Sequence, residues 1–336
     1  MYNLLVGGAA GLGVETTTEV LERFFKQAGC GVFTMRDLMS RIRGGHNFAR
    51  IRFGEQAPKS HSVHLDGIIA MDEETIAYHL ENLQPDGFLL CDSSTKTEDP
   101  RTISLDMKSI AKELGNVRAA GSVAIGAALK LFGLPFEEGV AHAVFRGSLR
   151  EDLVQVNVNA AKAGYEAASK KFDHITGDCS DHMFVSGNKA LALGAMVAGL
   201  QFYAAYPMSP STSILEYLAQ KAGELGIVVE QAEDEIAAIN FAIGASFAGG
   251  RAMTGTSGGG FSLMVEALGL SGIAEIPLVA VDVQRPGPAT GLPTRTEQSD
   301  LKFVISASQG EFPRMVIALR HHEDAYLQTI RAFDMA

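Results

Sequence analysis

Short apolar segments alternate with helix-like segments along both halves of the chain, and this alternation restricts the fold more than any other feature. Strands are predicted at residues 4–6, 31–34, 65–70 and 87–92, and again at 202–205, 227–231, 252–256 and 277–283. Helices are predicted between them, at residues 14–28, 78–83, 121–131, 188–199, 213–225, 235–249 and 261–270. Such alternation is typical of α/β proteins, whose helices cross over between parallel strands. We therefore predict two α/β domains, each with a parallel sheet.

A polar stretch without periodicity separates the two series. The 336 residues suffice for two domains that each bury a core. The stretch lies near residues 170–186 and predicts a domain at 1–175, a linker at 176–186 and a second domain at 187–336.

Charge, hydropathy and cysteine spacing exclude several classes of protein. The net charge of −11 argues against nucleic-acid partners. We expect no membrane association and a cytoplasmic location, because no apolar run is long enough to span a bilayer and no signal peptide precedes the first strand. Cys30, Cys91 and Cys179 lie far apart, whereas an iron–sulfur cluster needs four thiolates. We expect no metal site on this chain.

Four unusual motifs follow predicted strands between residues 206 and 300, where open α/β sheets form ligand sites. The first motif, at residues 206–212, contains Ser209 and Thr212, whose hydroxyls could bind a small polar substrate or cap a helix. Ser213 and Glu216 have the spacing of a capping box, which predicts that they begin the next helix.

The second motif places Glu235 at the start of a helix whose inward stripe is predicted to be Ile236, Ile239, Ile243 and Phe247. A carboxylate beside such packing is expected to be partly desolvated and to share a proton with a ligand nitrogen. The alternative is that Glu233, Asp234 and Glu235 only favour the first turn of the helix.

The third and fourth motifs are a glycine run and a Pro/Gly-rich loop. Ser257, Gly258 and Gly259 can present backbone amides at a helix N-terminus. Arg285 and Arg295 bracket the loop and could hold a carboxylate or phosphate, although either could simply be solvated.

In this order, the motifs at residues 206–212 and 284–298 resemble those of the α subunits of 2-oxoacid:ferredoxin oxidoreductases, particularly the 2-oxoglutarate type. In that type a γ domain, similar to domain III of pyruvate-ferredoxin oxidoreductase, precedes the α chain. The likeness extends to the first half through residues 8–13 and 42–47. It implies a γ-type first domain and a second domain that binds the pyrimidine ring of thiamine diphosphate, ending before a full-length α subunit would end.

The resemblance also assigns roles to these residues. Glu235 would contact the aminopyrimidine ring, and Ser209, Thr212, Arg285 and Arg295 would bind the 2-oxoacid. Tyr206, Pro207, Ser257, Gly258 and Gly259 would bind the cofactor. The Gly-Asp-Gly motif that holds diphosphate and Mg²⁺ and the cluster cysteines do not occur in this sequence. In the family both belong to a β subunit, which implies a heterotetramer that forms acyl-CoA and reduces ferredoxin.

The first glycine loop has the order G-x-x-G-x-G rather than that of the dinucleotide fingerprint. Asp37 is expected to trail the next strand, so NAD binding is disfavoured. Gly8, Gly11 and Gly13 could form a backbone nest for a phosphate of CoA. The nearby Arg41, Arg43, His46 and Asn47 could contact CoA or the β subunit, or form a solvated loop.

Three functions remain open. The first is the α subunit of a thiamine-dependent 2-oxoacid oxidoreductase, with 2-oxoglutarate as the expected substrate. The second is a non-catalytic assembly fragment of such a complex, and the third is an NAD(P)-dependent dehydrogenase.

Overall fold

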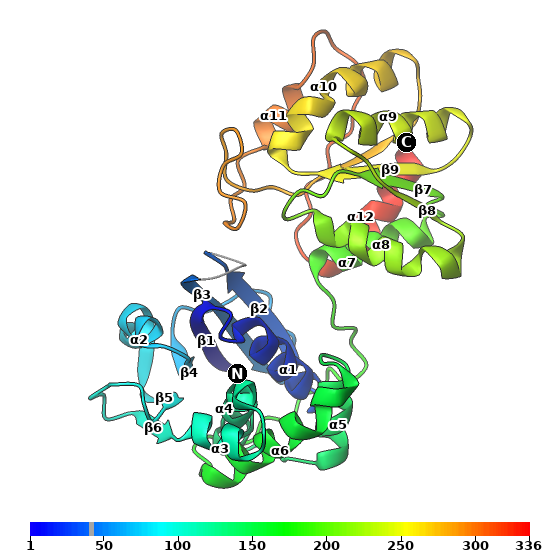
Figure 1. Ribbon diagram of the computed structural model, residues 1–336. Coiled ribbons are helices and arrows are strands. Elements are labelled where there is room, and N and C mark those ends of the chain that lie inside the picture. Colours follow the sequence, from blue (N-terminus) through cyan, green and yellow to red (C-terminus); the bar gives the residue numbers. More distant parts are fainter. Residues whose placement is uncertain (40–43) are drawn as a thin grey trace. The chain divides into compact units, whose positions relative to one another are not determined.

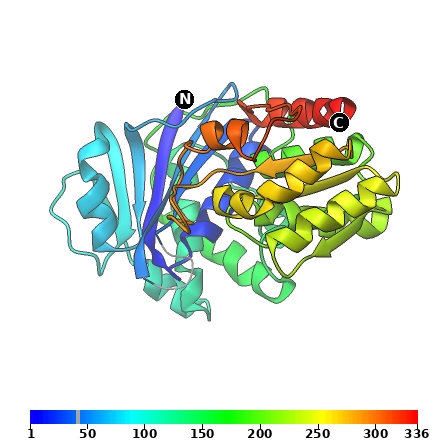
Figure 2. The ribbon, with the colours of Figure 1, turned by 90° about the horizontal axis from the view of Figure 1, so that it is seen from above.

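The computed structural model describes residues 1–39 and 44–336. Within it the chain forms two compact units, Met1–Phe184 and Val185–Ala336. Figures 1 and 2 show both units, each of which consists of a sheet with helices on its two faces.

The first unit contains a six-stranded sheet in the order β2-β3-β1-β4-β5-β6. Its strands are β1 (Tyr2–Ala10), β2 (Gly31–Asp37), β3 (Gly44–Gly54), β4 (Leu65–Ala70), β5 (Leu83–Asp92) and β6 (Thr102–Leu105). Its helices are α1 (Val14–Gln27), α2 (Glu73–His79), α3 (Met107–Glu113), α4 (Ala120–Leu131), α5 (Glu138–Arg146) and α6 (Glu151–Ala167), with short 3₁₀ turns at Leu80–Asn82 and Val117–Ala119. Helix α2 begins before the predicted residue 78 because Asp72 caps it by accepting from the Thr75 amide.

Side chains of successive strand residues point to opposite faces, and this gives the unit two cores. Leu4 and Val6 join the large core beneath α1, α4 and α6. Leu5, between them, joins a smaller core with Ile76 of α2. Figure 2 shows α2 and α1 on opposite sides of the sheet. The predicted buried face of α1, which contains Val20, Leu21, Phe24 and Phe25, is confirmed.

The prediction of a purely parallel first sheet is wrong. β3 was not predicted, and it pairs antiparallel with both β1 and β2. β2 and β3 are joined by a connection too short for a crossover, so they can only run antiparallel. The sheet is therefore mixed, with parallel pairing only between β1, β4, β5 and β6.

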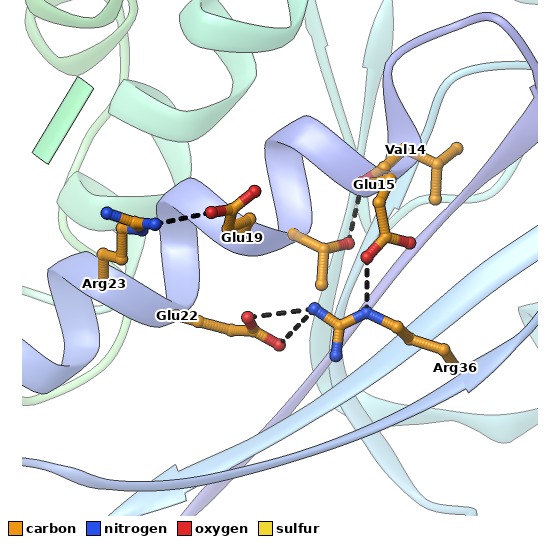
Figure 3. Close-up of polar contacts among 7 residues, drawn as sticks. Val14, Glu15, Glu19, Glu22, Arg23 and Arg36 are labelled. Atoms are coloured by element: carbon orange, nitrogen blue, oxygen red, sulfur yellow. Dashed lines mark hydrogen bonds and ion pairs between the residues drawn. The ribbon is translucent and has the colours of Figure 1, made fainter. Parts of the chain in front are cut away.

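Ion pairs connect the edge strand β2 to helix α1 (Figure 3). Arg36 of β2 donates from Nη2 to Glu22 at 2.8 Å and from Nε to Glu15 at 2.6 Å. Glu22 is buried, and burial raises the pKa of its carboxyl although Arg36 acts in the opposite direction. Arg36 therefore offsets the cost of burying a charge beneath an edge strand.

The second unit contains a four-stranded parallel sheet in the order β10-β9-β7-β8, as predicted for this half. Its strands are β7 (Phe202–Ala205), β8 (Val228–Gln231), β9 (Ala252–Thr256) and β10 (Val279–Asp282). Its helices are α7 (Gly187–Val197), α8 (Thr212–Leu225), α9 (Glu235–Phe247), α10 (Gly258–Ile273), α11 (Leu301–Ser306) and α12 (His322–Met335).

Helices cover both faces of this sheet (Figure 1). α7, α8 and α12 share a core with Tyr203 and Met253. On the other face, Ile239 and Ile243 of α9 pack against Met264 of α10. The strand order reverses at β7, since β8 lies on one side of it and β9 on the other. Ligands of open α/β sheets bind at such reversals, beyond the carboxyl ends of the strands.

Candidate functional site

The loops after β7 and β9 lie where open α/β sheets bind ligands, because both leave the carboxyl ends of neighbouring strands at the reversal of strand order. The first loop carries Tyr206, Pro207 and Ser209, and Tyr206 is exposed. Ser209 precedes a cis peptide bond to Pro210. Cofactor and substrate contacts predicted for these residues therefore fall at one edge of one sheet.

The predicted capping box at Ser213 and Glu216 is wrong. Helix α8 begins at Thr212 with Ser211 as its N-cap, and the turn closes on Met208, whose carbonyl accepts from the Ser211 amide and hydroxyl. Ser213 instead accepts from Asn188 Nδ2 at 2.8 Å. Because this turn starts the helix earlier, Thr212 is its first residue and lies half-buried.

Glu235 is the first residue of α9 and is only 3% exposed, and its Oε1 atom is buried without a hydrogen-bond partner. Asp234, which is exposed, caps the helix by accepting from the Ala237 amide at 2.7 Å. Capping thus explains Asp234 but not Glu235. A buried carboxylate oxygen without a hydrogen-bond partner is costly, and a ligand that supplies the missing partner would explain it.

The predicted inward stripe of α9 is wrong at two of its four positions. Ile239 and Ile243 are buried, whereas Ile236 is 49% and Phe247 80% exposed. The buried face is Glu235, Ala238, Ile239, Ala242, Ile243 and Ser246. Because α9 has apolar residues on all sides, its sequence does not select a face. The correction places Glu235 itself on the buried face.

Glu235 fits beside the first turn of α10 because residue 260 has no side chain. A Cβ at Gly260 would lie 2.1 Å from Thr256 Oγ1, 2.6 Å from Glu235 Oε1 and 2.7 Å from Glu235 Cγ. Thr256 is the last residue of β9 and is buried. The glycine therefore holds open the space that the carboxylate occupies, a role that the sequence prediction did not include.

The glycine run forms the N-terminus of α10. Ser257 is its N-cap, fully buried, and its hydroxyl has no partner. Gly258 and Gly259 are the first two helical residues, so their amides are among those that an α-helix leaves without internal acceptors. This N-terminus can therefore accept an anionic or polar ligand group.

Arg285 is 7% exposed and donates from Nη1 to the Ser209 carbonyl at 2.7 Å. The structure thus brings together two predicted substrate residues from the first and fourth motifs. Its Nε is buried without a partner. Arg295 is half-buried, and its amide donates to the Leu292 carbonyl.

Sequence reasoning missed two half-buried carboxyl groups, Asp300, which lies beside Gly258, and Asp282, which ends β10. Burial and the neighbouring Asp300 raise the pKa of Asp282 to about 7. The position of Asp282 at the end of a predicted strand was the available signal, but nothing in the sequence indicated that Asp300 returns to it.

In the first unit, the predicted nest is divided between a strand and a turn. Gly8 lies within β1, where a Cβ would be 2.8 Å from Met71 Cβ, so packing explains it. Gly11 and Gly13 have positive φ, and Gly13 is the N-cap of α1. Asp37 ends β2 rather than trailing it. NAD binding is instead disfavoured because β3 separates β2 from β1.

Of the predicted basic patch, Arg41 and Arg43 lie outside the described residues. His46 is buried and pairs with His79 through their Nε2 atoms at 2.8 Å. Burial lowers the pKa of His79 to about 4, so this pair is neutral at pH 7. Within residues 1–39 and 44–336, no group of three or more His, Cys, Asp or Glu side chains is arranged to hold a metal ion.

Two further findings concern the cysteines and the membrane-spanning helices considered from the sequence. Cys30, Cys91 and Cys179 are buried, and all three are free thiols. No helix in the described part of the chain combines the length and apolar character needed to cross a membrane.

Each unit of the chain matches a family model of known oxidoreductases. Residues 3–167 match the family model described as pyruvate ferredoxin/flavodoxin oxidoreductase, and residues 193–336 match its thiamine diphosphate-binding model. Subunit alpha of 2-oxoacid:ferredoxin oxidoreductase 1 from Aeropyrum pernix is 32% identical over 99% of this chain and 62% of its own length. The 2-oxoglutarate synthase subunit KorA from Archaeoglobus fulgidus is 45% identical over 45% of this chain and 44% of its own.

A solved structure covers nearly the whole chain. It is the 2-oxoglutarate:ferredoxin oxidoreductase from Magnetococcus marinus, with 2-oxoglutarate, coenzyme A and succinyl-CoA bound. Its TM-score is 0.89 at 30% identity, over 99% of this chain and 61% of that one. The chain thus spans about 62% of the length of the curated relative that it matches from end to end. The two family models and these relatives show that the chain belongs to the 2-oxoacid:ferredoxin oxidoreductase family.

Proposed function

We propose that this chain is the α-type subunit, with a γ-type first unit, of a thiamine diphosphate-dependent oxidoreductase that converts 2-oxoglutarate to succinyl-CoA and CO₂ and reduces ferredoxin. The observation that carries the proposal is the buried carboxylate of Glu235 near the sheet reversal, whose Oε1 has no hydrogen-bond partner. The names of KorA relatives and of the Magnetococcus enzyme support 2-oxoglutarate as the substrate.

The residues of the second unit fit the pyrimidine end of thiamine diphosphate. When bound, the cofactor supplies the carbanion chemistry that a 2-oxoacid needs for decarboxylation. Glu235 would hold a proton between its Oε1 and a ring nitrogen, because that atom has no partner within the protein. Ser257 Oγ, which is equally buried and unpartnered, would bind a second polar atom of the ring.

The residues proposed for the substrate lie on the loops beside this carboxylate. Arg285 would attract a substrate carboxylate with its unpartnered Nε, while its Nη1 remains bound to the Ser209 carbonyl. The hydroxyls of Ser209 and Thr212 and the guanidinium of Arg295 would contact the keto or distal carboxylate oxygens.

A partner β subunit would supply Mg²⁺ and the iron–sulfur cluster. One observation supports it: the neighbouring helices α9 and α10 expose Ile236, Phe241 and Phe247 together with Leu263 and Ile273. Large exposed apolar surfaces are typical of protein-interaction sites. In the first unit, the turn at Gly11 and Gly13 would bind a phosphate of CoA.

The test is co-expression of the chain with its β subunit, followed by an assay of CoA-dependent dye reduction with 2-oxoglutarate and thiamine diphosphate. Glu235→Gln should assemble normally and lose at least about 100-fold in kcat, the usual contribution of a positioned acid–base group. Glu233→Gln is the matched control, since Glu233 is exposed two residues earlier.

A Glu235→Gln complex that keeps most of its activity would refute the role of Glu235. A stable complex that turns over no 2-oxoacid would favour the assembly-fragment alternative.

A further inference from the structure

Residues 206–212, which we call the substrate loop, are held by hydrogen bonds to three consecutive backbone carbonyls. The Met208 carbonyl accepts from the turn that begins α8. The Ser209 carbonyl accepts from Arg285 Nη1 at 2.7 Å, and the Pro210 carbonyl accepts from Asn188 Nδ2 at 2.9 Å. Two of these three contacts come from segments distant in sequence, so the loop depends on them for its conformation.

Asn188 reaches the loop from the start of the second unit. It is the second residue of α7, and the unit itself begins at Val185. α7 packs beside α8 in one core (Figure 1). The Asn188 side chain is half-buried, and its Nδ2 also donates to Ser213 Oγ at 2.8 Å. One amide group therefore joins α7 to the end of the substrate loop and to the first turn of α8.

The chemistry of the contacts requires the amide nitrogen. A carbonyl oxygen only accepts hydrogen bonds, so Asn188 must present its NH₂ group to Pro210. This group has two N–H bonds, one for each contact, and both are used. An aspartate has nearly the same shape but no donor when ionised, and it would place a charged oxygen against the Pro210 carbonyl.

Helix capping does not explain Asn188. The N-cap of α7 is Ser186, whose hydroxyl accepts from the Lys189 amide at 3.3 Å. Both hydrogen bonds that Asn188 donates leave its own helix. The residue therefore serves the contact with the substrate loop and α8.

We propose that Asn188 is a positioning residue for the 2-oxoacid site, which holds the substrate loop so that the hydroxyls of Ser209 and Thr212 meet the substrate. It acts through the loop and does not touch the substrate itself. Its consequence for substrate binding rests on the proposed function, whereas the anchoring of the loop does not.

Hydrogen exchange of the full chain tests the anchor without requiring activity. Asn188→Asp removes both donors, and a carboxylate in the first turn of α7 favours that helix, so α7 should stay intact. The amides of Ser211 and Thr212, which donate to the Met208 carbonyl, should exchange about tenfold faster. The amide of Leu218, which is buried within α8, should exchange as before.

Kinetics of the assembled complex test the positioning role. In Asn188→Asp, KM for 2-oxoglutarate should rise about tenfold, the effect of losing one or two ordinary hydrogen bonds. The kcat and the affinity for thiamine diphosphate should stay within about twofold, because Glu235 and Ser257 lie on other elements. Asn159→Asp makes the same change at an exposed position of α6 and should behave as the unmodified chain does.

Unchanged exchange of the Ser211 and Thr212 amides in Asn188→Asp would overturn the anchor. Faster exchange with an unchanged KM would overturn the positioning role. If Asn188→Asp fails to fold, Ser213→Ala serves instead, since it removes one of the two acceptors and should raise both the exchange rate and KM by about threefold. An unmodified complex that turns over no 2-oxoacid would count against the proposed function, and the exchange result would then decide the anchor.

Discussion

Replacing Gly260 by Ala tests whether the empty space beside Glu235 is required. The added methyl would lie within 2.1–2.7 Å of Thr256 Oγ1, Glu235 Oε1 and Glu235 Cγ. These distances are far below van der Waals contact, so a side chain must move. The Glu235 side chain is buried, and it cannot rotate without displacing its neighbours.

Two opposing effects set the magnitude. Overpacking of a buried site costs about 1–3 kcal/mol, whereas exchanging Gly for Ala within a helix contributes about 1 kcal/mol of stability. The net effect expected for Gly260→Ala is therefore a loss of stability of up to about 2 kcal/mol. For a unit of this size, that lowers Tm by up to about 8 °C.

Gly244→Ala is the matched control. Gly244 lies in α9, the helix that Glu235 begins, and a Cβ there meets no atom within 4 Å. This variant should gain up to about 1 kcal/mol. Calorimetry of the full chain gives Tm, and titration of the assembled complex with thiamine diphosphate gives the cofactor affinity.

The two readouts separate packing from function. Gly260→Ala should bind the cofactor at least about tenfold more weakly, because displacement of the Glu235 carboxylate by an ångström removes a hydrogen bond to a charged group. A Gly260→Ala chain that is as stable as Gly244→Ala and binds the cofactor normally would refute the reasoning.

Two further substitutions test packing in each unit. Tyr203 is fully buried and its hydroxyl has no hydrogen-bond partner, so Tyr203→Phe should stabilise the second unit by about 1 kcal/mol in calorimetry. Tyr78 is exposed, and Tyr78→Phe should leave the stability unchanged. A loss of stability in Tyr203→Phe would contradict the absence of a partner for the hydroxyl. Arg36→Met leaves buried Glu22 without its guanidinium and should cost about 2 kcal/mol at pH 7, less than a fully buried pair because Arg36 is partly exposed. That deficit should shrink in acid, where Glu22 accepts a proton; a deficit that does not change with pH would contradict the assignment.

The sequence by itself determined most local elements, because they follow from short-range patterns. Strands β7 and β9 occupy the predicted residues 202–205 and 252–256. The buried face of α1 is also as predicted, since apolar and polar residues separate cleanly around that helix. The motifs around Glu235 and Arg285 likewise identified the loops that form the candidate site.

Only the tertiary structure decided which of these segments meet. The insertion of β3 as an antiparallel strand depends on pairing with β1, which no local pattern specifies. The buried face of α9 is chosen by α10 and the sheet, because the helix is apolar all round. The contact of Arg285 with Ser209 and the space that Gly260 leaves for Glu235 both join residues that are distant in sequence. Such contacts form only when the loops converge at one edge of the folded sheet, so the geometry of the site is determined by the tertiary structure.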